Sequence, residues 1–192
     1  MPVVKDKRRW RNTDRYLEND SLQKLNLGCG LSKIPGGVNV DFQARYGPDY
    51  VHDLNSFPYP FEDNTFDYVH CSQIIEHLHD TMRVMEEIHR ITKPDGIVYI
   101  GVPHFSSRIA YADPTHVRYF ASTTFTHYFP AGCYMSSRDI RFEVRSKTIT
   151  FSKLYNFLGV PLWANAMSRF YEDHFAHIFP AKFIHVLLQV KK

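Results

Sequence analysis

The sequence lacks any apolar run long enough to cross a bilayer. Its longest candidate, residues 183–190, is interrupted by His185 and Gln189, whereas a membrane helix needs about 20 consecutive apolar residues. The N-terminal stretch KDKRRWRNTDR also lacks the hydrophobic segment of a signal peptide. We therefore expect no membrane span.

The sequence also has few cysteines and only a small net charge. The three cysteines, Cys29, Cys71 and Cys133, are far apart and odd in number. This pattern argues against a disulfide framework or a cysteine-based zinc site, and it favours a cytoplasmic location. The net charge of +3 is too small to indicate nucleic-acid binding by itself. The basic residues among positions 1–20 alternate with Asp6 and Asp14, which is typical of a solvated arm, with a nucleic-acid patch as the alternative.

Repeats and low-complexity segments are absent too, and 192 residues with 44% hydrophobic content favour one domain. We divide the chain into a basic arm, residues 1–20, and a single domain, residues 21–192. Within that domain, strands are predicted at residues 25–27, 38–41, 50–52, 66–72 and 96–102, with a helix over residues 80–92 that Asp80 caps and Pro94 ends. This alternation predicts an α/β fold with an open, mostly parallel sheet.

The first three strands are joined by unusually short links. Only seven residues, 31–37, separate the first two strands, whereas a parallel crossover usually needs a dozen or more. We expect reduced helices there, so that the arm, residues 161–180 or a second subunit covers one face of the sheet. A homodimer would provide the last of these.

The second half of the chain is less regular. Residues 140–151 alternate and then shift phase, which predicts a strand with a bulge or turn near Ser146 and Lys147. A helical pattern follows over residues 161–180, and the last strand is expected at 183–190. The long, aromatic segment around residues 104–138 is predicted to be a substrate lid.

A possible ligand site lies where the predicted strands end. The first strand ends in Gly28-Cys29-Gly30, and glycines let a ligand approach the backbone. Asp41 ends the second strand, eleven residues after Gly30, where its carboxylate can accept hydrogen bonds from a ribose. Ligands of open α/β sheets bind at such carboxyl ends. A nicotinamide dinucleotide is the poorer alternative, because the fold that binds it usually has a G-x-G-x-x-G motif at the start of a helix and an acidic residue about 20 residues later.

Four runs over residues 24–103 resemble the class I S-adenosylmethionine-dependent methyltransferases of the small-molecule, methyltransferase-11-like type. They are LNLGCG, VNVD, HDLNSFPYPFEDNTFDYVHCSQIIEHL and IHRITKPDGIVYIGVP. The resemblance implies a Rossmann-like sheet of seven strands, mostly parallel with an antiparallel last strand, and S-adenosylmethionine as cofactor. It implies the cofactor-binding residues Gly28, Cys29 and Gly30 (methionine part), Asp41 (ribose), Asp53 and Leu54 (adenine), and Ser72 and Gln73 (sulfonium end). Asn26 stands where the family usually has an acid.

The densest polar motif of the second half runs from residue 113 to 120. Methyl transfer mainly requires alignment, but a hydroxyl acceptor also benefits from a general base. We predict His116, oriented by Asp113, as that base, with His104 as the competing candidate. In the alternative interpretation Asp113 caps a turn and His116 packs against Tyr119.

The other acceptor-side residues are Arg118, Tyr119 and Tyr111. Arg118 is predicted to bind a phosphate or carboxylate of the substrate, with pairing to a surface acid as the alternative. Tyr119 and Tyr111 are candidates for stacking on a sugar or flat ring.

The Glu76-His77 pair raises the question of a metal. In ubiquinone-type and small-RNA O-methyltransferases a Glu-x-x-Glu-His run binds a divalent metal. Here the neutral Gln73 stands at the first acid, which weakens a site for a hard cation. We therefore expect His77 to be structural and no metal to be bound.

Together these observations predict a cytoplasmic methyltransferase acting on oxygen or nitrogen of a small-molecule or glycan-like acceptor. One alternative is a nucleic-acid methyltransferase that uses the basic arm. Another is a non-catalytic module of the same fold that binds only a cofactor or a partner.

Overall fold

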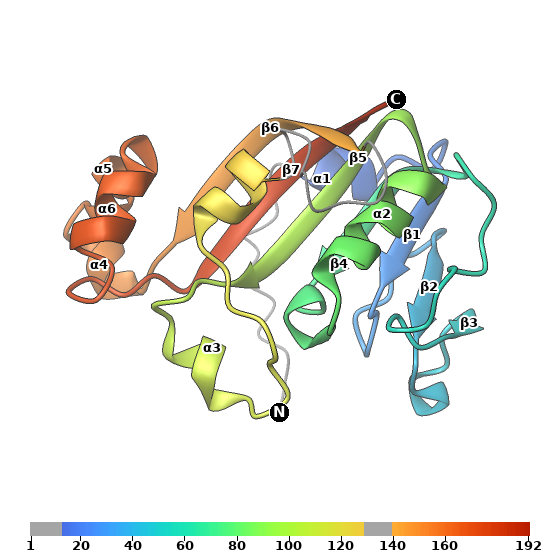
Figure 1. The fold of residues 1–192 in the computed structure, drawn as a ribbon, viewed down its shortest axis with the longest axis horizontal. Helices are drawn as coiled ribbons and strands as arrows, with labels where there is room; N and C mark the ends of the chain where they lie inside the picture. Colours follow the sequence, from blue (N-terminus) through green and yellow to red (C-terminus); the bar gives the residue numbers. More distant parts are fainter. Residues whose placement is uncertain (1–12, 129–139) are drawn as a thin grey trace.

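A computed structural model describes residues 13–128 and 140–192 of the chain. Its centre is a seven-stranded sheet in the order β3-β2-β1-β4-β5-β7-β6 (Figure 1). The strands are β1 (Lys24–Leu27), β2 (Val38–Asp41), β3 (Tyr50–Val51), β4 (Phe66–Ser72), β5 (Thr92–Pro103), β6 (Arg141–Thr150) and β7 (Phe183–Lys191). The first five strands pair in parallel, and β7 runs antiparallel between β5 and β6. The predicted Rossmann-like α/β sheet with an antiparallel last strand is confirmed.

The helix between β4 and β5 follows its sequence pattern closely. It is α2 (Thr81–Ile91), and the Asp80 carboxylate caps it by accepting a hydrogen bond from the Arg83 amide at 3.0 Å. Val84, Met85 and Ile88 are buried against the sheet. The helix ends before Pro94, because Thr92 already has extended backbone angles and begins β5.

The link between β1 and β2 contains no helix, as the short spacing predicts. Two buried asparagines hold it instead. The side-chain Nδ2 of Asn26 donates to the Ser32 carbonyl at 2.9 Å and to Asn39 Oδ1 at 3.1 Å. Asn39 in turn accepts from the Ile34 amide at 2.8 Å and donates to the Gly37 carbonyl at 2.9 Å. Each asparagine thus bonds to the loop backbone, which supplies the fixed geometry that a crossover helix would otherwise provide.

The end of the N-terminal arm covers part of the sheet. It forms α1 (Asp14–Leu17), where Tyr16 stacks on Tyr68 with ring centroids 5.3 Å apart. Tyr16 and Leu17 pack against a cluster that also contains Ile97, Tyr99 and Leu187. This cluster lies on β4, β5 and β7, so the arm covers the middle of the sheet rather than the β1–β3 end.

The segment 161–180, which we also expected as a cover near β1–β3, lies at the opposite edge. It forms α5 (Val160–Ala166) and α6 (Ser168–His174), which with α4 (Lys153–Phe157) lie beyond β6 (Figure 1). Their buried residues join Ile149 and Phe151 in a second apolar cluster. The helical pattern is thus correct as far as His174, but its predicted position as a cover for β1–β3 is wrong.

The remaining short elements are η1 (Ala44–Tyr46) after β2, η2 (Ile75–His77) after β4, and α3 (Arg108–Ala112) and η3 (Thr124–Tyr128) after β5. The irregularity predicted in β6 is present as a register shift between Val144 and Ser146. Of the predicted lid, residues 129–138 lie outside the described part of the chain, as does Cys133. Across residues 13–128 and 140–192, no helix combines the length and apolar character needed to cross a membrane.

Candidate functional site

The turn after β1 is built on glycine geometry. Gly28 and Gly30 have φ values of +70° and +47°, a backbone conformation that residues other than glycine rarely adopt. A Cβ atom on Gly28 would lie 2.5 Å from Cγ1 of Ile74, so the backbone must pass close to the segment after β4 there. A Cβ atom on Gly30 would meet no heavy atom of the described residues within 4 Å, apart from those of its two chain neighbours. The turn is therefore packed on one side and open on the other.

Asp41 lies against this turn. Its Oδ2 accepts a hydrogen bond from the Gly30 amide at 2.8 Å, and its Oδ1 accepts one from the Gln43 amide at 2.9 Å. The residue is only 6% exposed. The amide of Cys29 donates to the Val40 carbonyl at 2.9 Å, which joins the turn to β2 just before the acid. The carboxylate thus points at the glycine turn and retains free lone pairs at the rim of the sheet.

The other predicted cofactor residues lie along the same edge. Asp53 is exposed, and its Oδ1 accepts from the Asn55 amide at 2.9 Å in a local turn. Leu54 is buried, and its carbonyl accepts from the Tyr59 hydroxyl at 3.0 Å. Ser72 ends β4. Gln73 follows with a φ of 55°, and its side-chain amide donates to the Gly101 carbonyl at 3.0 Å.

His104 is fully buried, and both of its ring nitrogens have partners. Its Nδ1 accepts from the Ser106 amide at 3.1 Å, and its Nε2 lies 3.1 Å from Glu172 Oε1 on α6. Burial raises the pKa of Glu172, but hydrogen bonds from His104 and from the Ser122 amide outweigh it, so the net shift is downward. The ring therefore joins the end of β5 to α6, and it is poorly placed to take a proton from an acceptor.

Asp113 does not orient His116 as predicted. Asp113 Oδ1 accepts from both the amide and the hydroxyl of Thr115, at 2.9 and 2.6 Å, and these bonds lower the pKa of Asp113. His116 instead bonds through Nδ1 to the Ala110 carbonyl at 2.9 Å. The reason is local, since an aspartate side chain readily bonds to the backbone two residues on and so forms a turn.

The other acceptor-side candidates lie on the surface of the same segment. The Arg118 guanidinium donates to the carbonyl of His79 rather than pairing with an acid. Tyr111 and Tyr119 are exposed and stack on each other, with ring centroids 4.8 Å apart. They form a flat aromatic surface whose role in acceptor binding stays a prediction.

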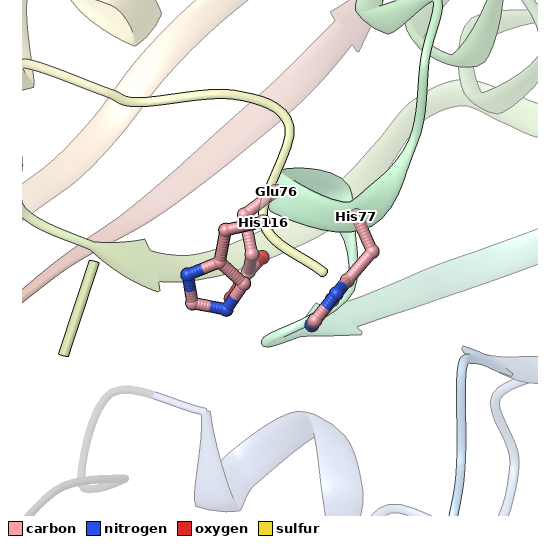
Figure 2. A group of neighbouring side chains, drawn as sticks. All are labelled: Glu76, His77 and His116. Carbon is pink, nitrogen blue, oxygen red and sulfur yellow. The ribbon is translucent and has the colours of Figure 1, made fainter. Parts of the chain in front are cut away.

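The structure brings together a group that sequence reasoning did not assemble. Glu76, His77 and His116 each place a possible ligand atom within 4.8 Å of the others (Figure 2). The Glu76 carboxylate is buried, and desolvation raises its pKa to about 8, with Asp113 adding to the effect. Glu76 and His116 are forty residues apart in the chain, so no local spacing could have revealed this grouping.

Comparisons with known proteins give the same fold. The family described as "Methyltransferase domain" matches residues 38–100, from β2 to β5. A SAM-dependent methyltransferase of Archaeoglobus fulgidus aligns with a TM-score of 0.61 and 19% identity, over 95% of this chain and 92% of that one. One from Mesorhizobium loti aligns with a TM-score of 0.55 and 14% identity, over 93% and 96%. Residues 38–100 thus match the methyltransferase-domain family, and the described fold is that of S-adenosylmethionine-dependent methyltransferases. The cofactor that this fold implies is S-adenosylmethionine, and the glycine turn with its open side at Gly30 and the buried acid Asp41 fit it.

Curated relatives match this chain over shorter stretches. A demethylmenaquinone methyltransferase of Geobacillus stearothermophilus is 46% identical over 73 residues, which is 38% of this chain and 30% of the relative. A mitochondrial arginine hydroxylase of Homo sapiens is 50% identical over a stretch covering 40% of this chain and 27% of the relative. The matches therefore span less than a third of either relative. The two names also show that similar sequences serve different reactions, so the fold alone does not settle the activity.

Proposed function

We propose that this domain transfers a methyl group from S-adenosylmethionine to an oxygen or nitrogen of a small-molecule or glycan-like acceptor. The contact between Asp41 and Gly30 is the observation that supports it most directly. Each Asp41 oxygen accepts one backbone hydrogen bond and keeps a second lone pair. Two free lone pairs on one carboxylate match the two hydroxyl groups of a ribose.

The remaining residues have roles set by their positions along the edge. The backbone of Gly28, Cys29 and Gly30 would border the methionine part, since no side chain fills the open side of the turn at Gly30. Asp53 and Leu54 would lie toward the adenine, and Ser72 and Gln73 toward the sulfonium. The sulfonium supplies an already activated methyl group, so the work left to the protein is to hold the acceptor in line with it.

A hydroxyl acceptor must also lose a proton. His116 is the better candidate for receiving it, because its Nδ1 bonds to a carbonyl and therefore carries the hydrogen, which leaves the Nε2 lone pair free. His104 is buried with both nitrogens engaged. Arg118, Tyr119 and Tyr111 lie on the same segment and would contact the acceptor.

We also propose a cytoplasmic location and a homodimer. Cys29 and Cys71 are free and buried, which suits a reducing compartment. Near the β1–β3 end, Leu31, Phe42 and Val51 are 76%, 63% and 60% exposed, and a second copy would cover them. Light scattering on the purified chain tests the dimer, which a monomeric mass at micromolar concentration would exclude.

Calorimetric titration with S-adenosylhomocysteine tests the cofactor assignment, with NADH as the matched control ligand. Saturable binding of the first and no binding of the second is expected. Cofactor turnover is then followed by mass spectrometry with pools of hydroxyl and amine acceptors. No binding of S-adenosylhomocysteine would refute the proposal, and binding without turnover on any pool would favour the non-catalytic module.

A further inference from the structure

The backbone fixes the cluster of Glu76, His77 and His116 in place. Glu76 and His77 lie on η2, directly after β4, and His116 lies on the loop that follows α3. The amides of Val117 and Arg118 both donate to the Glu76 carbonyl, at 2.9 and 3.1 Å. The two segments are therefore held together where the three side chains lie near one another, as Figure 2 shows.

The Glu76 carboxylate in this cluster has no partner among the described residues. The residue is 1% exposed, and neither Oε1 nor Oε2 accepts a hydrogen bond from any of them. A buried carboxylate without a hydrogen bond or a counter-charge is strongly unfavourable, and such groups in folded proteins are normally paired or coordinate a metal. A carboxylate oxygen of Glu76 and one nitrogen from each of the two imidazole rings lie within 4.8 Å of one another.

Both rings turn a lone pair away from the protein backbone. His116 Nδ1 lies 2.9 Å from the Ala110 carbonyl, which can only accept, so Nδ1 carries the hydrogen and Nε2 does not. His77 Nδ1 faces the Thr115 carbonyl at 3.3 Å and the Thr115 hydroxyl at 2.9 Å. That hydroxyl donates to Asp113, so it accepts from His77, whose Nε2 is likewise left with a lone pair.

This arrangement is the usual one around a metal. A ligating histidine almost always donates its other N–H to a carbonyl or carboxylate, which fixes the tautomer and the ring orientation. Asp113 therefore acts as a positioning residue for His77 through Thr115, in place of its predicted role beside His116.

We propose that Glu76, His77 and His116 together bind one divalent first-row transition-metal ion, with Zn²⁺ as the best match. Two imidazole nitrogens and one carboxylate oxygen suit Zn²⁺ and its neighbours, whereas Mg²⁺ and Ca²⁺ prefer oxygen ligands throughout. Ligand bonds of about 2.0–2.2 Å place the ligand atoms of a tetrahedral ion roughly 3.3–3.6 Å apart. In the structure the three ligand atoms lie within 4.8 Å of one another, so small rotations of the two partly exposed rings would bring them to the spacing of a tetrahedral ion.

The site differs from the sequence-based expectation that His77 is structural and no metal is bound. The neutral Gln73 removes one acid from the local run, but His116 supplies a ligand from a distant segment. An ion there would occupy the Nε2 lone pair that the general-base role of His116 requires, so the two roles are alternatives. Metal binding is measured without cofactor or acceptor, so its failure is distinguishable from failure of the proposed methyl transfer.

The test is calorimetric titration of the chelator-stripped full chain with ZnCl₂. One site per chain is expected. Glu76→Gln and His116→Ala should each weaken Zn²⁺ binding by more than about 100-fold, and Asp113→Asn, which alters the hydrogen-bond partner of Thr115, by about 10–100-fold. The matched control is His174→Ala, because this histidine is exposed on α6, outside the cluster, and should leave Zn²⁺ binding unchanged.

Thermal unfolding of each variant separates loss of the site from loss of the fold. Glu76→Gln keeps the size of the side chain, so it remains decisive if the alanine variant does not fold. ZnCl₂ should raise the Tm of the wild type and not that of Glu76→Gln. Absence of a stoichiometric site, or equal Zn²⁺ affinity in the wild type and Glu76→Gln, overturns the proposal. Equally tight MgCl₂ binding that Glu76→Gln also abolishes would overturn the ion class.

Discussion

Replacing Asp41 by asparagine changes the rim of the sheet with little change in shape. The aspartate accepts from the Gly30 amide with one oxygen and from the Gln43 amide with the other. In Asp41→Asn one of these amides faces an NH₂ group, which cannot accept. The substitution therefore removes the negative charge and one of the two backbone bonds that hold the carboxylate toward the turn.

The expected effect on cofactor binding follows from the strength of charged hydrogen bonds. A bond to a charged group contributes about 1.5–3 kcal/mol. Losing the charge that faces the ribose should weaken binding of S-adenosylhomocysteine by roughly 10- to 150-fold. Calorimetric titration of the wild type and of Asp41→Asn under identical conditions measures the ratio directly.

Asp67→Asn is the matched control for charge. Asp67 lies near the start of β4, and it pairs with Lys93 at 2.9 Å rather than facing the turn. Its substitution removes the same charge and should leave S-adenosylhomocysteine affinity within about twofold. If Asp41→Asn binds as tightly as the wild type, the carboxylate does not hold the ribose, and the reasoning from its contact with Gly30 is wrong.

Three further predictions concern stability, each measured by urea unfolding. Gly28→Ala should lower the free energy of unfolding by about 1–3 kcal/mol more than Gly30→Ala does. Both glycines have positive φ, but only a Cβ on Gly28 would meet a neighbour at 2.5 Å, so equal losses in the two variants would contradict this. Asn39→Ala should cost about 2–5 kcal/mol, since it strips partners from the β1–β2 loop, while the exposed Asn156→Ala should cost under about 1. Burial lowers the pKa of His70 from 6.5 to about 3. Between these two pH values only the unfolded chain binds this proton, so the free energy of unfolding decreases as the pH is lowered. The resulting loss should reach about 3 kcal/mol near pH 4.5, and His70→Gln should reduce it; an unchanged pH dependence in that variant would exclude His70 as the cause.

The strands and their ends could be predicted because their signals are local. The sequence predicts a strand over residues 66–72, and β4 has those limits. The short spacing between the first two strands predicts a reduced crossover helix, and the link contains none. The sequence did not reveal how the loop is held instead, because the amide of Asn26 meets Asn39 across two strands.

The acceptor side could be predicted much less well. The Asp113–His116 pairing was inferred from proximity in the chain, but a nearer Thr115 competes for the carboxylate. His104 directly follows β5, yet Glu172 on a distant helix engages its ring. In both cases the side chain's partner depends on which groups fold around it.

The order of the strands along the chain, the helix before β5, the glycine turn and the position of Asp41 at the end of β2 all follow from local sequence patterns. Hydrophobic periodicity, backbone conformation and capping act over a few neighbouring residues, so these features can be predicted from the chain. The burial of His104, the hydrogen bonds of Asp113 and the grouping of Glu76 with His77 and His116 became visible only in the folded chain. Those outcomes depend on contacts between segments tens of residues apart, where packing and the burial of charge, rather than sequence spacing, select each partner.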